Sequence, residues 1–332
     1  MKITIAEKLK PFSHMPGAAC LIPGTCFEIE AFPTLIRLGK KYELNLHITG
    51  PVKDFTLELD LEKNCVFVFG KAKEGFYRLK IEGSQNGIEV DVVNAPKGFL
   101  INANPFKARE RLFFSEELDF FLPSVWERLS LGRQKAQDWD LVWRRFDLRE
   151  ILPVIFGLGQ KIPFIEAHPL KGTGRLLKEG NFASFCKAAF SKILIPRFLD
   201  EEYQGLSPIE TVEGNPCFLL QEAASRLRSL FFFQEGTSLF LLPSSQFVSG
   251  RMTRIQVADV GELDLEWASR LLRRCVLRAT FSRSIVFHLP TPLRSFRVRM
   301  SPSQKGFRHE AKNPLAIEAG KTYLIDRFQH GS

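Results

Sequence analysis

The sequence predicts an α+β fold in which an antiparallel β-sandwich is followed by a helical block and then by a second antiparallel β-domain. The basis is the hydrophobic pattern. Apolar residues alternate with polar ones up to about residue 110, recur at helical spacing to about residue 236, and alternate again towards the C-terminus. Alternation is typical of a strand with one buried face, and a spacing of three to four residues of an amphipathic helix. We therefore expect three domains, at 1–110, 111–236 and 237–332.

The first block carries short strand patterns separated by turn residues. The predicted strands are 42–48, 55–60, 65–69, 76–81 and 88–93. Asn86 and Gly87 separate the last two strands and predict a tight hairpin, because both residues accept positive φ. Short strands with frequent turn signals predict an antiparallel sandwich.

In the second block, residues able to cap a helix precede each helical pattern. The expected caps are Asp138, Asp147, Asn181 and Asn215. A side-chain oxygen at such a position accepts a hydrogen bond from a free backbone N–H of the first turn. The third helix is expected to run to Leu194, with Pro196 ending it. Four or five helices fit here, with loops at 168–180 and 197–214.

Alternation returns after residue 238. The expected strands are 239–243, 253–257, 271–279, 285–289, 296–300 and 321–325. If Phe296, Val298 and Met300 face inward, Arg297 and Arg299 share the outer face, because successive side chains of a strand point to opposite sides.

The composition is that of a globular protein and excludes several classes. Of 332 residues, 45% are hydrophobic and 25% are charged, which is too apolar for a disordered chain. No apolar run approaches the roughly 18 residues of a membrane span, and the first residues lack the apolar core of a signal peptide. The six cysteines form no C-x-x-C pair and the six histidines are dispersed, so we expect buried thiols, no metal, no cofactor and a cytoplasmic location. Walker A, G-x-S-x-G and G-x-G-x-x-G motifs are absent.

Positive charge is concentrated in the last third of the chain. Residues 226–308 hold fourteen basic and five acidic residues, a net charge of +9 that equals that of the whole chain. We predict a basic face that contains Arg273, Arg274, Arg278, Arg294, Arg297 and Arg299. Such a face attracts nucleic acid or another polyanion, an anionic lipid surface, a sugar phosphate or an acidic partner protein. The alternative is an ordinary solvated surface, partly neutralised by carboxylates of the helical block.

A polar segment follows the predicted third helix. It combines three carboxylates, an aromatic ring and an amide, at Asp200, Glu201, Glu202, Tyr203 and Gln204. Paired carboxylates perform glycosidic cleavage, and Tyr and Gln side chains can orient sugar hydroxyls. Three acids in a row are also typical of a solvated loop. We therefore take these five residues as candidate ligand contacts and assign no catalytic residue.

Two further polar segments are interpreted as structural. The segment 171–175 resembles a phosphate-binding loop only superficially, since no Lys-Ser/Thr pair follows, and we expect a flexible loop between helices. In 132–140, Trp139 lies on the apolar stripe and Asp138 at a cap position. The ion pairs expected on these helix surfaces join Arg144, Arg145 or Arg149 to Asp140 or Asp147.

Several short motifs follow one another in the C-terminal third. They are Leu241-Leu242-Pro243, Gly250-Arg251, Gly261, Asp264-Leu265-Glu266-Trp267, Leu277-Arg278-Ala279 and Ala319-Gly320-Lys321-Thr322-Tyr323. In this order they resemble the junction between the helical toroid and the C-terminal β-domain of (α/α)6-toroid glycoside hydrolases, notably the α-L-fucosidase-like ones. The β–α–β order of the chain is similar to the layout of that family. The resemblance implies recognition of a glycan or another sugar-containing ligand.

The chain departs from that family in its helical part. Such enzymes build their toroid from about a dozen helices, and the roughly 120 residues between the β-blocks here are too few for them. The resemblance therefore carries over no catalytic residue. Residues 126–139 are also similar to segments of uncharacterised proteins from obligate intracellular bacteria, a likeness that implies no function.

Three functions follow as hypotheses. The first is a sugar-recognition protein on a reduced glycoside-hydrolase-like architecture, without a complete hydrolase machinery. The second is an interaction protein that binds a polyanion or an acidic partner through its basic face. The third is a residual glycoside hydrolase.

Overall fold

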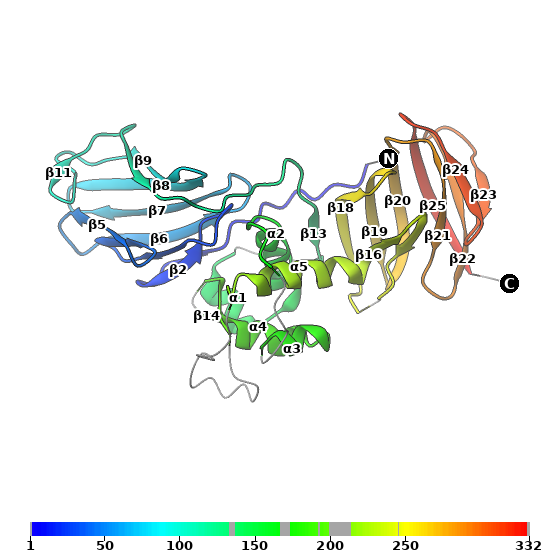
Figure 1. The fold of residues 1–332 in the computed structure, drawn as a ribbon, viewed down its shortest axis with the longest axis horizontal. Coiled ribbons are helices and arrows are strands. Elements are labelled where there is room, and N and C mark those ends of the chain that lie inside the picture. Colours follow the sequence, from blue (N-terminus) through cyan, green and yellow to red (C-terminus); the bar gives the residue numbers. More distant parts are fainter. Residues whose placement is uncertain are drawn as a thin grey trace. The chain divides into compact units, whose positions relative to one another are not determined.

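The computed structural model describes residues 2–132, 137–166, 173–191, 193–198, 214–244 and 246–330. Antiparallel sheets dominate it, and the described residues contain five helices, so the predicted α+β class and its order of elements are confirmed (Figure 1). Contacts divide the chain into two compact units. The N-terminal unit contains 8–123 and 135–223, and the C-terminal unit contains 1–7, 124–134 and 224–332.

Two six-stranded sheets form most of the N-terminal unit. Their strands are β1 (Phe12–Ser13), β2 (Ala18–Leu21), β3 (Glu28–Ala31), β4 (Leu35–Leu38), β5 (Tyr42–His47), β6 (Lys53–Asp60), β7 (Cys65–Ala72), β8 (Gly75–Ser84), β9 (Gly87–Asn94), β10 (Leu100–Ile101), β11 (Asn104–Pro105) and β12 (Arg111–Ser115). The sheet orders are β1-β6-β7-β8-β9-β12 and β11-β10-β5-β4-β3-β2. Tyr77 of β8 lies between the sheets, where its ring stacks on Phe99 and its Oη donates to the carbonyl of Pro33 at 2.9 Å.

The predicted hairpin at Asn86-Gly87 is present, but its turn lies one residue earlier. Ser84 pairs with Gly87, so the two turn residues are Gln85 and Asn86. Gly87 has a φ of 145°, and a Cβ there would lie 2.0 Å from the carbonyl oxygen of Phe114 on β12. The glycine is therefore required by the close approach of the neighbouring strand.

Helices and a short hairpin complete the N-terminal unit. They are α1 (Trp139–Arg145), α2 (Leu148–Gly159), α3 (Thr173–Lys178), α4 (Phe182–Ala189), β14 (Phe190–Ser191) and β15 (Ile195–Pro196), and α5 (Phe218–Phe231) begins here and ends in the C-terminal unit. The predicted caps Asp138, Asp147 and Asn181 each accept a hydrogen bond from a backbone N–H of the helix that follows. Asn215 accepts instead from the N–H of Cys217, within the turn before α5.

Two predictions for this block are wrong. The third predicted helix ends at Ala189 instead of Leu194, because the chain enters the β14–β15 hairpin, where Leu194 has a φ of 51°. The predicted loop at 171–175 is helical from Thr173 onward, because the apolar Leu176 and Leu177 bury one side of α3.

The C-terminal unit packs a seven-stranded sheet on a four-stranded one. Its strands are β13 (Arg128–Ser130), β16 (Phe232–Glu235), β17 (Ser238–Leu241), β18 (Gly250–Val257), β19 (Gly261–Ala268), β20 (Leu271–Ala279), β21 (Arg283–His288), β22 (Leu293–Arg299), β23 (Phe307–Glu310), β24 (Pro314–Ile317) and β25 (Thr322–His330). The orders are β13-β18-β19-β20-β25-β22-β23 and β16-β17-β21-β24. Phe287 of β21 contacts Phe296 of β22 edge to face at 5.4 Å, and Phe231 of α5 stacks on Trp267 at 4.9 Å.

The outer face of the larger sheet is partly covered by the first residues of the chain. Ile3 is buried against Val276 of β20 and Leu324 of β25. The carbonyl of Thr4 accepts a hydrogen bond from Arg251 at 3.2 Å. The remainder of this face carries the charged side chains described next.

Candidate functional site

The candidate ligand contacts Asp200, Glu201, Glu202, Tyr203 and Gln204 all lie outside the described residues. The residues of the predicted basic face lie in the C-terminal unit, within the described residues.

The predicted basic face is mostly a set of ion pairs. Register places five charged residues directly opposite one another on neighbouring strands: Arg251 (β18), Glu266 (β19), Arg274 (β20), Asp326 (β25) and Arg297 (β22). Arg251 pairs with Glu266 at 3.0 Å, Arg274 pairs with the same carboxylate, and Arg297 pairs with Asp326 at 2.8 Å. Opposite charges at directly paired positions stabilise a sheet.

Two more arginines of the predicted basic face also form ion pairs within the sheet. Arg299 pairs with Asp326 at 2.6 Å, so it shares a face with Arg297, as predicted. Arg278 pairs with Glu262 and with the buried Asp264, both at 2.8 Å. The neutralising carboxylates belong to β19 and β25, so the expectation that the helical block would supply them is wrong for these pairs.

These contacts hold the carboxylates in their charged form. Hydrogen bonds from Arg274 and Arg251 lower the pKa of Glu266, against the opposing effect of burial. Burial acts to raise the pKa of Asp326, but the hydrogen bonds and charges of Arg297 and Arg299 outweigh it, so this pKa is lowered too. Hydrogen bonding to a carboxylate favours its ionised form.

The C-terminal unit nevertheless keeps a large excess of positive charge. It contains twenty basic and ten acidic residues, whereas the N-terminal unit contains 26 and 27. Nine exposed cations of this unit have no carboxylate partner among the residues that the structure describes: Lys2, Arg254, Arg270, Arg273, Arg294, Lys305, Lys312, Lys321 and Arg327. Of the predicted face, only Arg273 and Arg294 are in this group.

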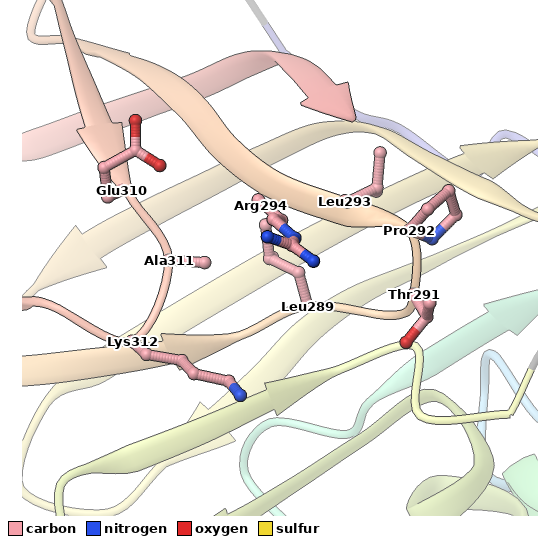
Figure 2. Close-up of a pocket in the computed structure, with 8 residues that line it drawn as sticks. All are labelled: Leu289, Thr291, Pro292, Leu293, Arg294, Glu310, Ala311 and Lys312. Carbon is pink, nitrogen blue, oxygen red and sulfur yellow. The ribbon is translucent and has the colours of Figure 1, made fainter. Parts of the chain in front are cut away.

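Two of these cations line one pocket, which we call the crossover pocket. It has a volume of about 590 Å³ and is lined by Leu289, Thr291, Pro292, Leu293, Arg294, Glu310, Ala311 and Lys312 (Figure 2). Two connections between the sheets form it, one from β21 to β22 and the other from β23 to β24. The chain thus brings together residues about twenty positions apart.

The polar groups of the crossover pocket are held by the backbone. The carbonyl of Arg294 accepts from the N–H of Ala311 at 2.8 Å, and the N–H of Lys312 donates to the carbonyl of Phe287 at 3.0 Å. Glu310 pairs with Arg308 at 3.2 Å, and Figure 2 shows its carboxylate directed away from the Lys312 ammonium. The pocket therefore offers the guanidinium of Arg294 and the ammonium of Lys312, neither of which pairs with a carboxylate of the residues that the structure describes.

A second pocket contains residues of the glycoside-hydrolase-like motifs. This pocket, the Gly250 pocket, measures about 720 Å³. Its polar side chains are those of Glu7, Ser130, Ser249, Arg251, Glu266 and Arg273. The backbone at Gly250 lies against the ring of Trp267, and a Cβ added at this glycine would lie 2.2 Å from a ring carbon. The indole is only 1% exposed, so its face is not available to a sugar ring. The lowered pKa of Glu266 makes it a poor proton donor for a leaving group.

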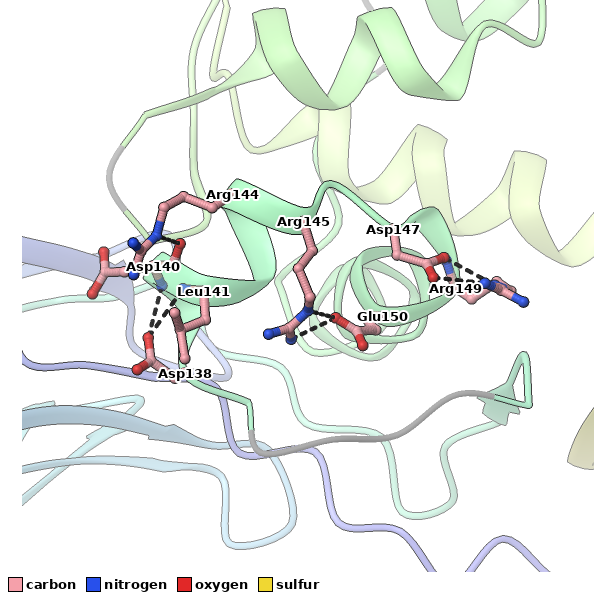
Figure 3. Close-up of polar contacts among 8 residues, drawn as sticks. All are labelled: Asp138, Asp140, Leu141, Arg144, Arg145, Asp147, Arg149 and Glu150. Carbon is pink, nitrogen blue, oxygen red and sulfur yellow. Dashed lines mark hydrogen bonds and ion pairs between the residues drawn. The ribbon is translucent and has the colours of Figure 1, made fainter.

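The charged cluster at the start of α1 and α2 has the structural role that the sequence predicts. Figure 3 shows the Asp138 carboxylate accepting from the first backbone N–H groups of α1. Arg149 pairs with Asp147 at 2.7 Å, as predicted, whereas Arg145 pairs with Glu150, also at 2.7 Å. Arg144 donates to the backbone carbonyl of Asp140 at 3.4 Å, so its predicted carboxylate pairing is wrong.

Neither a metal centre nor a spanning helix is found in the described ranges. No group of three or more His, Cys, Asp or Glu side chains there could hold a metal ion. None of the helices there is long and apolar enough to cross a membrane. The sequence matches no known family model and no curated protein.

Proposed function

We propose that the C-terminal unit binds an anionic saccharide, and that the crossover pocket receives its charged group. The observation that carries this proposal is that Arg294 and Lys312 line the same pocket of about 590 Å³. Neither side chain has a carboxylate partner among the residues that the structure describes. Arg and Lys donate charge-assisted hydrogen bonds to phosphate, sulfate and carboxylate groups. The protein acts here as a binding protein.

The other lining groups favour a sugar as the carrier of that charge. The hydroxyl of Thr291 can donate to or accept from a sugar hydroxyl. Leu289, Pro292 and Leu293 supply apolar contact for the C–H surface of a ring. The motifs that resemble α-L-fucosidase-like proteins support the same ligand class.

The charge of the whole unit supports a second candidate, the binding of a polyanion or an acidic protein over many exposed cations. The unpartnered cations of the described residues extend well beyond one pocket. Binding of that kind has no single centre and weakens steeply as salt rises.

Matched variants separate the two candidates. We would measure affinity for sulfated and phosphorylated oligosaccharides, neutral oligosaccharides and an oligonucleotide, at low and high salt. The variant Arg294→Gln/Lys312→Gln removes the pocket cations, and Lys321→Gln/Arg327→Gln removes two exposed, unpartnered cations elsewhere in the same unit. A loss of about tenfold or more in saccharide affinity is expected for the first variant only. Equal losses in both variants would favour diffuse polyanion binding, and full affinity of the first would exclude the pocket.

A further inference from the structure

A row of three aromatic rings crosses the outer face of the four-stranded sheet in the C-terminal unit. This aromatic row consists of Phe233 of β16, Phe240 of β17 and His288 of β21, which lie directly opposite one another on neighbouring strands. The ring centroids of Phe233 and Phe240 are 4.2 Å apart with an interplanar angle of 9°, and those of Phe240 and His288 are 4.2 Å apart at 13°. All three side chains are partly exposed. The anion-binding proposal uses none of them.

The alternation of the strands places the aromatic row on the side away from the core. The preceding or following residues Phe232, Leu239 and Phe287 are buried, and Phe287 contacts Phe296 of the larger sheet. Successive side chains of a strand point to opposite faces, so the row faces outward.

This outer face carries little charge. In β16, β17, β21 and β24, which lie wholly within the described residues, the alternation places one carboxylate, Glu235, and no Lys or Arg on the outer face. The face is therefore suited to apolar contact with an uncharged part of a ligand.

The aromatic row ends beside the crossover pocket. His288 is the last residue of β21, directly before Leu289, which lines that pocket (Figure 2). The N–H of Lys312, another lining residue, donates to the carbonyl of Phe287 at 3.0 Å. Because His288 stacks on Phe240 of β17, its other ring face is turned toward β24, on the far side of β21 and next to Lys312. The row is thus continuous with the pocket.

We propose that the end of the aromatic row is a second subsite, in which an uncharged sugar ring packs on the face of His288 that is turned away from Phe240. The charged group of the same saccharide occupies the crossover pocket. This inference rests on the proposed function and narrows its ligand to an oligosaccharide of at least two residues that carries its charge at one end.

The chemistry of the rings selects His288 within the row. The C–H surface of a sugar ring is apolar, and its contact with the face of an aromatic ring removes both from water. Each face of Phe240 is already covered by a neighbouring ring, Phe233 on one side and His288 on the other. His288 is the member of the row that offers a ring face next to the pocket.

Two matched pairs of ligands test the subsite: glucose 6-phosphate with maltose 6′-phosphate, and galactose 6-sulfate with lactose 6′-sulfate. Calorimetry with the full-length chain gives the ratio of affinities within each pair. In the wild type, the disaccharide of at least one pair is expected to bind about fivefold more tightly than its monosaccharide. His288→Ala should abolish this gain and change the affinity for the monosaccharide by less than about twofold.

Two further variants serve as controls. His288→Phe keeps an aromatic face and should keep the gain, and it replaces His288→Ala as the deciding variant if the latter fails to fold. Phe281→Ala removes an exposed aromatic ring of the same unit outside the row and should also keep the gain. Both ligands of a pair are measured on one preparation, so a partly unfolded fraction does not alter the ratio.

The outcomes separate the subsite from the proposed function. A gain that persists in His288→Ala, or that is lost in His288→Phe or Phe281→Ala, would overturn the subsite. Equal binding of monosaccharide and disaccharide by the wild type would overturn it too, yet would leave the crossover pocket as the anion site if Arg294→Gln/Lys312→Gln weakens both. A wild type that binds none of the four ligands would contradict the proposed function and the subsite together.

Discussion

The arginines of the C-terminal unit differ in what they contact, and this decides their role. Arg297 and Arg299 are half-buried and share the carboxylate of Asp326, which is 8% exposed. Arg308 and Glu310, in contrast, form an exposed pair. Removing a buried anion leaves its cations without a partner, whereas an exposed pair contributes little.

The variant Asp326→Asn is therefore expected to lower the free energy of unfolding by about 2 kcal/mol. Glu310→Gln is the control, with an expected loss of at most about 0.5 kcal/mol. Urea unfolding of both variants measures the difference. Equal losses would mean that Asp326 does not stabilise the sheet through its arginines.

At the scale of elements, helix caps and some strand bounds could be predicted from the sequence, whereas the register between strands could not. The caps Asp138, Asp147 and Asn181 were predicted because a cap depends on residues within one turn. The strand β20 also has the predicted bounds, 271–279. In contrast, register between distant strands brings Asp326 opposite Arg274 and Arg297, so the sequence did not show which carboxylates neutralise the arginines of the predicted basic face.

Other parts of the fold were missed for reasons that differ. The strand β19 carries a clear alternation of Leu263, Leu265 and Trp267 with acidic residues, a signal that could have identified it. The strands β1 to β4 are too short for a periodic signal. The crossover pocket depends on two connections between sheets, and no local pattern marks it.

Gly87 of β9 lies where the neighbouring strand β12 comes closest, so substitution of this glycine tests how closely the two strands must pack. Gly87→Ala places a methyl group against the carbonyl of Phe114, at a φ of 145°, and is expected to lower the free energy of unfolding by about 2 kcal/mol or more. Gly98→Ala is the matched control, since its φ is also positive, at 74°, and nothing lies within 4 Å of the added carbon. About 1 kcal/mol is expected there. A Gly87→Ala loss no larger than this would show that the neighbouring strand yields.

At the scale of the molecule, the two units differ in net charge. The N-terminal unit is almost neutral, with 26 basic and 27 acidic residues, whereas basic residues outnumber acidic ones two to one in the C-terminal unit. Within that unit the carboxylates of Glu262, Asp264, Glu266 and Asp326 are bound by arginines. Its surplus cations thus remain available to a ligand.

The same carboxylates set the response of the unit to acid. The pKa values of Glu266 and Asp326 are lower in the folded chain than their ordinary values of 4.5 and 3.8. The unfolded chain therefore takes up protons first as the pH falls, and the stability that these groups contribute is present above those ordinary values and lost as the pH falls through the folded ones. Urea unfolding between about pH 6 and pH 3 should give a smaller dependence on pH for Glu266→Gln/Asp326→Asn than for the wild type. Identical slopes would contradict this source of acid sensitivity.

The central claim is that the crossover pocket binds an anionic saccharide. It is tested most directly by finding which backbone amides the bound saccharide protects from hydrogen exchange. Hydrogen exchange with and without a sulfated oligosaccharide would measure this across the chain. We expect protection confined to the two connections that form the crossover pocket, around 287–294 and 310–313, and we expect it to be lost in Arg294→Gln/Lys312→Gln. Protection elsewhere, with these two segments unchanged, would contradict it.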